Sequence, residues 1–181
     1  MHGGVFIDLR ICSLPVDVKK LADDAGVHLV KDSDAEVLRG EYGRVFYNGK
    51  NWIIVYNDSL PYHICRYTIA HELGHVFLQH QLTKKKYKSM GNGIYKAKRS
   101  ELHADYFADR LLCPACVLWA LELDTPEKIA ELCAVDMDVA KRRLKRLEEL
   151  KKRNRFLTDP LEKELYENFL PFIETVREKQ N

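Results

Sequence analysis

The chain has 181 residues, of which 46% are hydrophobic and 31% are charged, and its formal net charge is +2. This balance is ordinary for a globular protein and supplies enough apolar side chains for a core, so we expect one domain with at most a small appendage. The near-neutral charge says little about partners. No stretch reaches the run of about 18 apolar residues that a membrane-spanning helix needs, so we expect no membrane partner.

The N-terminus and the cysteines indicate the compartment. Residues 1–4 lack the basic-then-apolar order of a signal peptide. The five cysteines are an odd number and are scattered along the chain: Cys12, Cys65, Cys113, Cys116 and Cys133. Reduced thiols in a cytoplasmic protein fit this pattern better than a disulfide framework. Cys113 and Cys116 have the spacing of half a zinc ribbon, but no second pair exists, so we expect structural thiols.

The first part of the chain alternates between helical and extended patterns. Residues 13–25 predict a short helix with one apolar stripe, and Gly26 follows where a C-terminal cap would lie. Residues 27–30 then predict a strand, and residues 31–36 predict a polar turn.

A hairpin follows. Residues 44–47 and 52–56 are rich in aromatic and β-branched side chains, and Asn48-Gly49 between them tolerates the positive φ of a tight turn. We therefore expect a small antiparallel sheet, whose edge could pair with an unfolded peptide.

The next segment carries the most specific motif of the chain, His71-Glu72-Leu73-Gly74-His75. Residues 57–59 and Pro61 predict a helix start before it. Residues four apart share a helix face, so the imidazoles of His71 and His75 converge, and together they make half of a tetrahedral zinc site. Glu72 lies beside the first ligand without being forced to bind, which is where a general base for a metal-bound water belongs.

The segment from Lys84 to Lys98 holds six lysines and Gly91-Asn92-Gly93, with little apolar periodicity. We expect a solvated loop there, which could also serve as a mobile flap over the cleft.

The remainder of the chain predicts helices. Residues 99–112 form the first, Thr125-Pro126 opens the second, and residues 139–152 form the third after a short break. This helix, turn and helix order resembles a helix-turn-helix. A last helical stretch begins at residue 159, and Pro171 is expected to kink or divide it.

A catalytic zinc site needs three protein ligands and one open position. Glu101 is the best third candidate, because it opens a helix that could pack across the first. Asp105, one turn later, could accept a hydrogen bond from the ring of His71 and fix its orientation. The competing ligands are His80, which points away from the two imidazoles, and His103, which faces a different side from Glu101.

Residues 66–75, with the sequence Arg-Tyr-Thr-Ile-Ala-His-Glu-Leu-Gly-His, precede Glu-Leu-His-Ala-Asp-Tyr-Phe-Ala at residues 101–108 and Leu111-Leu112-Cys113-Pro114. Together these segments resemble the ImmA/IrrE family of metallo-endopeptidases, from about Pro15 to Leu147. The resemblance implies a glutamate-zincin core with Glu101 as third ligand and Asp105 as its supporting acid. Cys113 departs from the family, which usually has an apolar residue such as Met there.

The resemblance also implies a substrate class: helix-turn-helix repressors of phages, mobile elements or stress regulons, cut at one site to derepress their genes. Zinc would activate a water, and Glu72 would take its proton and pass it to the leaving amine. Tyr95, Tyr106 and His80 are candidate donors to the oxyanion. Mn²⁺ and Fe²⁺ are alternative metals, because availability decides as much as affinity.

We therefore expect an α+β fold in which a small antiparallel sheet packs on the active-site helix. The expected parts are a zinc peptidase domain at residues 1–122, a helix-turn-helix-like segment at 123–155 and a C-terminal helical extension at 156–181. The segment from Lys141 to Arg155 has nine basic and two acidic residues. It could contact DNA weakly or be a solvated helix face. The alternative function is a DNA- or protein-binding regulator with a structural or inactive zinc site.

Overall fold

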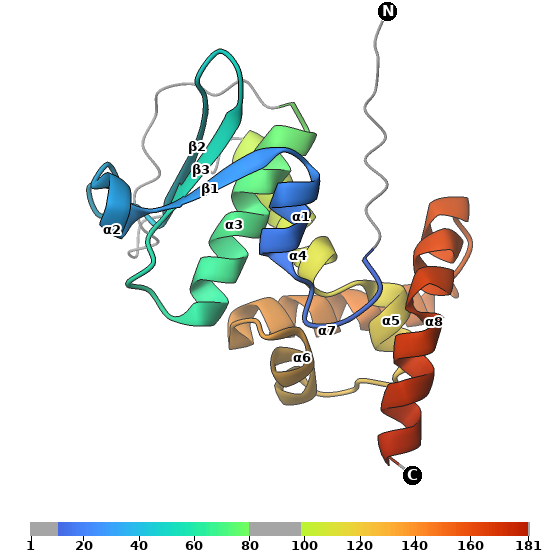
Figure 1. Cartoon of the computed structure of the whole chain (residues 1–181). Coiled ribbons are helices and arrows are strands. Elements are labelled where there is room, and N and C mark those ends of the chain that lie inside the picture. Colours follow the sequence, from blue (N-terminus) through green and yellow to red (C-terminus); the bar gives the residue numbers. More distant parts are fainter. Residues whose placement is uncertain (1–10, 80–98, 181) are drawn as a thin grey trace, which may run out of the picture.

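The structure, a computed structural model, describes residues 11–79 and 99–180 and combines a small sheet with a larger set of helices (Figure 1). This confirms the α+β class expected from the sequence. The elements in chain order are α1 Val18–Asp24, β1 Val27–Lys31, α2 Asp32–Ala35, β2 Gly43–Tyr47, β3 Trp52–Tyr56, α3 Tyr62–Phe77, α4 Arg99–Leu112, α5 Ala115–Ala120, α6 Pro126–Cys133, α7 Met137–Lys152 and α8 Pro160–Gln180.

The three strands are ordered β1-β3-β2, so β2 is an edge strand. β2 and β3 form the predicted antiparallel hairpin, and Gly49 in its loop has a φ of 95°. β1 pairs with β3 in parallel, so the expectation of a wholly antiparallel sheet is wrong. The direction of β1 follows from α1, which precedes it by a turn at Ala25-Gly26 and packs on both β1 and α3.

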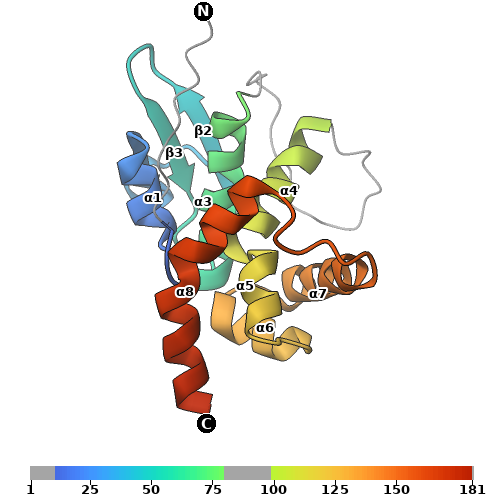
Figure 2. The ribbon, with the colours of Figure 1, turned by 90° about the vertical axis from the view of Figure 1, so that its right-hand side faces the viewer.

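α3 occupies the centre of the molecule, with the sheet and α1 on one side and α4 on another (Figures 1 and 2). Ile69 and Leu73 of α3 and Ile54 of β3 are among the fully buried side chains of the core. At the start of the helix the buried Arg66 donates to the carbonyl of Val16 over 2.7 Å and to that of Cys133 over 3.4 Å. The helix that carries the motif is therefore held near its start by polar contacts and in its middle by core packing.

Several boundaries differ from the expectation. α1 begins at Val18 because Asp17 accepts hydrogen bonds from the amides of two following residues. The predicted polar turn contains the short helix α2. α3 has Pro61 at its N-cap position without a side-chain cap. α8 runs through Pro171 without being divided.

The downstream helices follow the prediction closely. α4 spans the predicted range, and the side chain of Thr125 caps α6 with Pro126 in its first turn. α7 begins slightly before the predicted residue because Asp136 caps it. The predicted loop from Lys84 to Lys98 lies outside the described residues. Among the described helices, none combines the length and the apolarity that crossing a lipid bilayer requires.

Candidate metal centre

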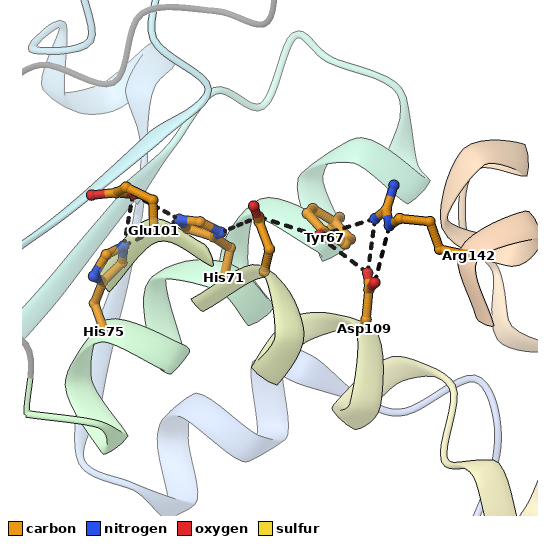
Figure 3. Close-up of polar contacts among 7 residues, drawn as sticks. Tyr67, His71, His75, Glu101, Asp109 and Arg142 are labelled. Atoms are coloured by element: carbon orange, nitrogen blue, oxygen red, sulfur yellow. Dashed lines mark hydrogen bonds and ion pairs between the residues drawn. The ribbon is translucent and has the colours of Figure 1, made fainter. Parts of the chain in front are cut away.

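Two polar stripes meet where α4 packs on α3. Each stripe has side chains four residues apart, which places them on one helix face. The stripe of α3 consists of Tyr67, His71 and His75, and that of α4 consists of Glu101, Asp105 and Asp109. Tyr67 contacts Asp109, His71 contacts Asp105 and His75 contacts Glu101. The residue numbers rise along α3 as they fall along α4, so the two helices run antiparallel and the stripes face each other (Figure 3).

Three ligand-type atoms gather at one end of the stripes. His71 Nε2 and His75 Nε2 are 3.1 Å apart, and Glu101 Oε2 lies 3.5 Å from the first and 3.3 Å from the second. Two atoms bound at about 2.0–2.2 Å to one tetrahedral ion lie about 3.3–3.6 Å apart. The two distances to Glu101 lie in this range and the distance of 3.1 Å between the histidine nitrogens is slightly shorter, so a small outward movement of the rings would let the three atoms share one cation. Among the described residues, these three are the group able to hold a metal ion.

Glu101 Oε2 is buried and, within the described part of the chain, makes no hydrogen bond of acceptable geometry, although both rings are close. A buried carboxylate oxygen without such a bond is costly unless a cation meets it. Burial by itself raises the pKa of Glu101, but the adjacent His71 and His75 outweigh it and lower that pKa to about 2. The carboxylate is thus kept charged and aimed at the space between the imidazoles.

Asp105 fixes the ring of His71. Its Oδ1 lies 2.9 Å from His71 Nδ1, so an Nδ1–H tautomer donates to the carboxylate and leaves Nε2 directed at Glu101 and His75. Burial lowers the pKa of His71, but the carboxylates of Asp105 and Glu101 outweigh it and raise that pKa to about 9. The excess of negative charge favours a positive species at this position.

Glu72 lies beside the group but is not among its ligand atoms. Its side chain is buried, and its Oε2 accepts a 3.0 Å hydrogen bond from the backbone N–H of Val45 on β2. Burial raises the pKa of Glu72, although the two histidines act in the opposite sense. The sheet edge therefore orients a buried carboxylate beside the two histidines, and burial makes that carboxylate a stronger proton acceptor.

Two glycines allow the close approaches that build the site. A Cβ on Gly43 would overlap the side chain of Thr68, so β2 can lie against α3 near Glu72 only with glycine there. A Cβ on Gly74 would lie 3.1 Å from Ala104 Cα and 3.2 Å from Phe107 Cβ, tighter than ordinary contact. Gly74 therefore lets α4 approach α3 closely enough for Glu101 to reach the histidines.

Replacing Gly74 by Ala should weaken metal binding while changing stability little. Alanine gains up to about 1 kcal/mol of helix propensity, which offsets the strain of the added methyl group. The methyl group pushes α4 and Glu101 outward, so we expect metal affinity to fall about tenfold. Competitive titration against a chromophoric chelator would measure this, with thermal unfolding of the metal-free protein alongside. Gly74→Val should lower metal affinity further than Gly74→Ala does. Equal metal affinities for the parent and both variants would contradict a role for the close approach of α4 at Gly74.

The stripes continue beyond the ligands to α7 (Figure 3). The hydroxyl of Tyr67 lies 3.3 Å from Asp105 Oδ1 and 3.2 Å from Asp109 Oδ1. Arg142 of α7 donates to Asp109 through Nε over 3.0 Å and through Nη2 over 2.9 Å. The sequence predicted a functional role for none of these three residues. The signal for Asp109 was its position as the third acid at a spacing of four, whereas nothing in the sequence marks Arg142 as its partner.

The other candidates lie apart from the group or outside the described residues. His103 and Tyr106 are on α4 but not in the group, and Tyr106 is 52% exposed. His80 and Tyr95 lie outside the described residues, so their predicted roles stay untested. The cysteines expected to be structural include the buried Cys113 and Cys116; burial raises the pKa of the Cys116 thiol to about 11.

Comparison with known proteins agrees with this geometry. The peptidase family model described as the IrrE N-terminal-like domain matches residues 22–145, well over half of the chain. This range contains α3 and α4 with all the residues of the two stripes. A search of curated proteins finds no match. The family supports a metallopeptidase-type function acting on a protein substrate. The chain belongs to the ImmA/IrrE family of peptidases.

Proposed function

We propose that this protein is a zinc-dependent endopeptidase that cleaves a helix-turn-helix repressor and thereby derepresses transcription. The observation that carries the proposal is the triangle of His71 Nε2, His75 Nε2 and Glu101 Oε2, with edges of 3.1, 3.3 and 3.5 Å, beside a separate buried carboxylate. Two imidazoles and one carboxylate are a ligand set of catalytic zinc in peptidases, with a fourth position for water or substrate.

Each residue has one role in the proposed reaction. His71, His75 and Glu101 would hold the metal, and Asp105 would keep the ring of His71 in its Nδ1–H tautomer. When bound, the ion would lower the pKa of a coordinated water to about 7 and stabilise negative charge on the scissile carbonyl oxygen. Glu72 takes the proton of the attacking water and later delivers it to the leaving amine.

The sheet edge offers a place for the substrate backbone. β2 is an edge strand of the sheet and lies directly beside Glu72, to which its Val45 donates. An extended peptide added along such an edge gains backbone hydrogen bonds. The exposed Phe46 and Tyr47 on the same strand would contact side chains of that peptide. Such pairing requires an unfolded segment, so the cleaved bond is expected in a linker of the repressor.

Removing the metal should abolish cleavage. The test uses the full chain and, as the first candidate substrate, the helix-turn-helix repressor encoded next to its gene. We expect strong chelation to stop cleavage at one bond and added zinc to restore it, with Mn²⁺ and Fe²⁺ compared in parallel. Gel and mass analysis of the products would measure this. Cleavage that persists after complete chelation would refute the proposal, and equal turnover of an unstructured casein peptide would refute repressor specificity.

A DNA- or protein-binding regulator with a structural or inactive metal site is the second candidate. It is favoured by the basic character of α7, whose exposed side chains include Lys141, Lys145 and Arg146. Clustered cations on a helix after a turn can contact phosphates. The two candidates differ in one respect: only the first loses its biological effect when Glu72 is replaced.

A further inference from the structure

We infer that Tyr67, Asp109 and Arg142 are positioning residues that hold Asp105 against His71 and so set the geometry in which His71 meets the metal. The inference deepens the proposed function and rests on it only in taking His71 as a ligand. It adds α7, a helix that contributes no ligand, to the metal centre.

The hydroxyl of Tyr67 is shared between two carboxylates. Its oxygen lies 3.3 Å from Asp105 Oδ1 and 3.2 Å from Asp109 Oδ1, and a hydroxyl has a single hydrogen to donate. Asp105 Oδ1 is the same atom that accepts from His71 Nδ1 at 2.9 Å. Whichever carboxylate takes the hydrogen of Tyr67 therefore determines how firmly Asp105 is held beside the histidine.

Arg142 decides this competition. Its Nε donates to Asp109 Oδ2 over 3.0 Å and its Nη2 to Asp109 Oδ1 over 2.9 Å, a two-pronged pairing that only a guanidinium can make. The same Nη2 lies 3.4 Å from the oxygen of Tyr67. The oxygen of Tyr67 lies slightly closer to Asp109 than to Asp105. Because Asp109 already accepts two hydrogens from Arg142, we infer that the hydroxyl of Tyr67 is available to donate to Asp105.

Burial makes this arrangement necessary. The side chain of Asp109 is 9% exposed, so its charge has little solvent to compensate it, while the side chain of Arg142 is 49% exposed. Without the arginine fork, Asp109 would draw on the neighbouring hydroxyl of Tyr67, and two carboxylates would compete for one hydrogen. The ring of His71 would then lose part of its support.

A structural clamp and a positioning residue predict different results for Arg142→Lys. Lysine keeps the positive charge beside Asp109 but cannot make the fork. If Arg142 only neutralises charge or ties α7 to α4, metal affinity stays unchanged. If its geometry assigns the hydroxyl to Asp105, metal affinity falls although the net charge is the same.

The experiment measures zinc affinity of the full chain by competition with a chromophoric chelator. Arg146→Lys is the matched control, because Arg146 is on the same helix, is 43% exposed and pairs with Glu149 over 2.9 Å, away from the stripes. We expect Arg142→Lys to lower affinity about three- to tenfold, below the effect of losing a direct partner of a ligand, and Arg146→Lys to leave it unchanged. Thermal unfolding of the metal-free variants separates metal binding from folding.

The double variant tests whether Arg142 acts through the hydroxyl. Tyr67→Phe alone should also lower affinity, without any change of charge. In the Tyr67→Phe background, Arg142→Lys should cost less than about twofold more, because the hydrogen that it directs is gone. Visible absorption of the cobalt-loaded proteins gives a second readout, since a turned His71 alters the ligand field.

Four outcomes overturn the inference or separate it from the proposed function. Unchanged zinc affinity in Arg142→Lys overturns it, and so does a loss that is the same with and without the hydroxyl of Tyr67. A parent protein that binds zinc but cleaves nothing overturns the proposed function alone. The zinc affinities of the variants would still test whether Arg142 and Tyr67 position Asp105. A parent protein that binds no divalent ion overturns both.

Discussion

Replacing Glu72 by Gln should reduce peptide hydrolysis by about 10²–10⁴-fold, the usual contribution of general acid–base catalysis, while the metal stays bound. Glutamine has nearly the same shape, and its amide oxygen can still accept the 3.0 Å hydrogen bond from the N–H of Val45. It cannot take a proton from water. Burial raises the pKa of Glu72, so removing this buried charge should not lower stability.

Three measurements test this prediction together: the cleavage rate of the repressor, the zinc content of the purified protein and its thermal unfolding. Glu164→Gln on α8 is a matched control, because the same change is made at an exposed residue outside the two stripes. Cleavage by Glu72→Gln at the parent rate would rule out Glu72 as the base. Loss of cleavage with the biological effect retained would favour the binding regulator instead.

Replacing Phe169 by Ala should destabilise the protein by about 3–5 kcal/mol, the usual cost of removing a fully buried aromatic ring. Phe169 and Ile173 of α8 are both 0% exposed and belong to the same apolar core as the residues of α3 and α5. For a chain of this size the loss corresponds to a fall of roughly 6–20 °C in Tm. Thermal unfolding with chelator present would measure it.

The control for Phe169→Ala is Leu161→Ala on the same helix. Leu161 is 71% exposed, so its truncation should change stability by less than about 0.5 kcal/mol. A similar small change for Phe169→Ala would mean that α8 is dispensable for the core. The expected difference would show that the segment predicted as a C-terminal extension completes the apolar core, although it lies beyond the family match at residues 22–145.

The parts of the molecule that were predictable are encoded locally. The range of α4 and the start of α6 at Thr125-Pro126 depend on caps, prolines and apolar spacing within a few residues. The gathering of His71, His75 and Glu101 depends on the spacing of four within α3 and on one helix crossing another. Their roles in binding metal, and that of Glu72 in catalysis, stay predictions.

The parts that were not predictable depend on distant contacts. The N–H of Val45 meets Glu72 across 27 residues, and Arg142 meets Asp109 across 33. Neither pairing leaves a periodic pattern. The parallel pairing of β1 with β3 was missed for the same reason, because an apolar strand shows the same alternation whichever way its neighbour runs.

Both facing stripes have a polar side chain at every fourth residue. The attraction between the acidic and the histidine side chains alone therefore does not specify how α4 aligns with α3. Sliding α4 by one helical turn along α3 would offer Asp105 to the histidines in place of Glu101, and Ala108 to Gly74 in place of Ala104. Attraction between the α4 carboxylates and the two histidines, taken alone, hardly distinguishes these two alignments. Ring packing does: the centroids of Phe107 and Phe77 lie 5.6 Å apart, and a slipped helix would put Leu111 there instead. Together with the pairing of Arg142 and Asp109, this aromatic contact favours the alignment in which Glu101 faces His71 and His75.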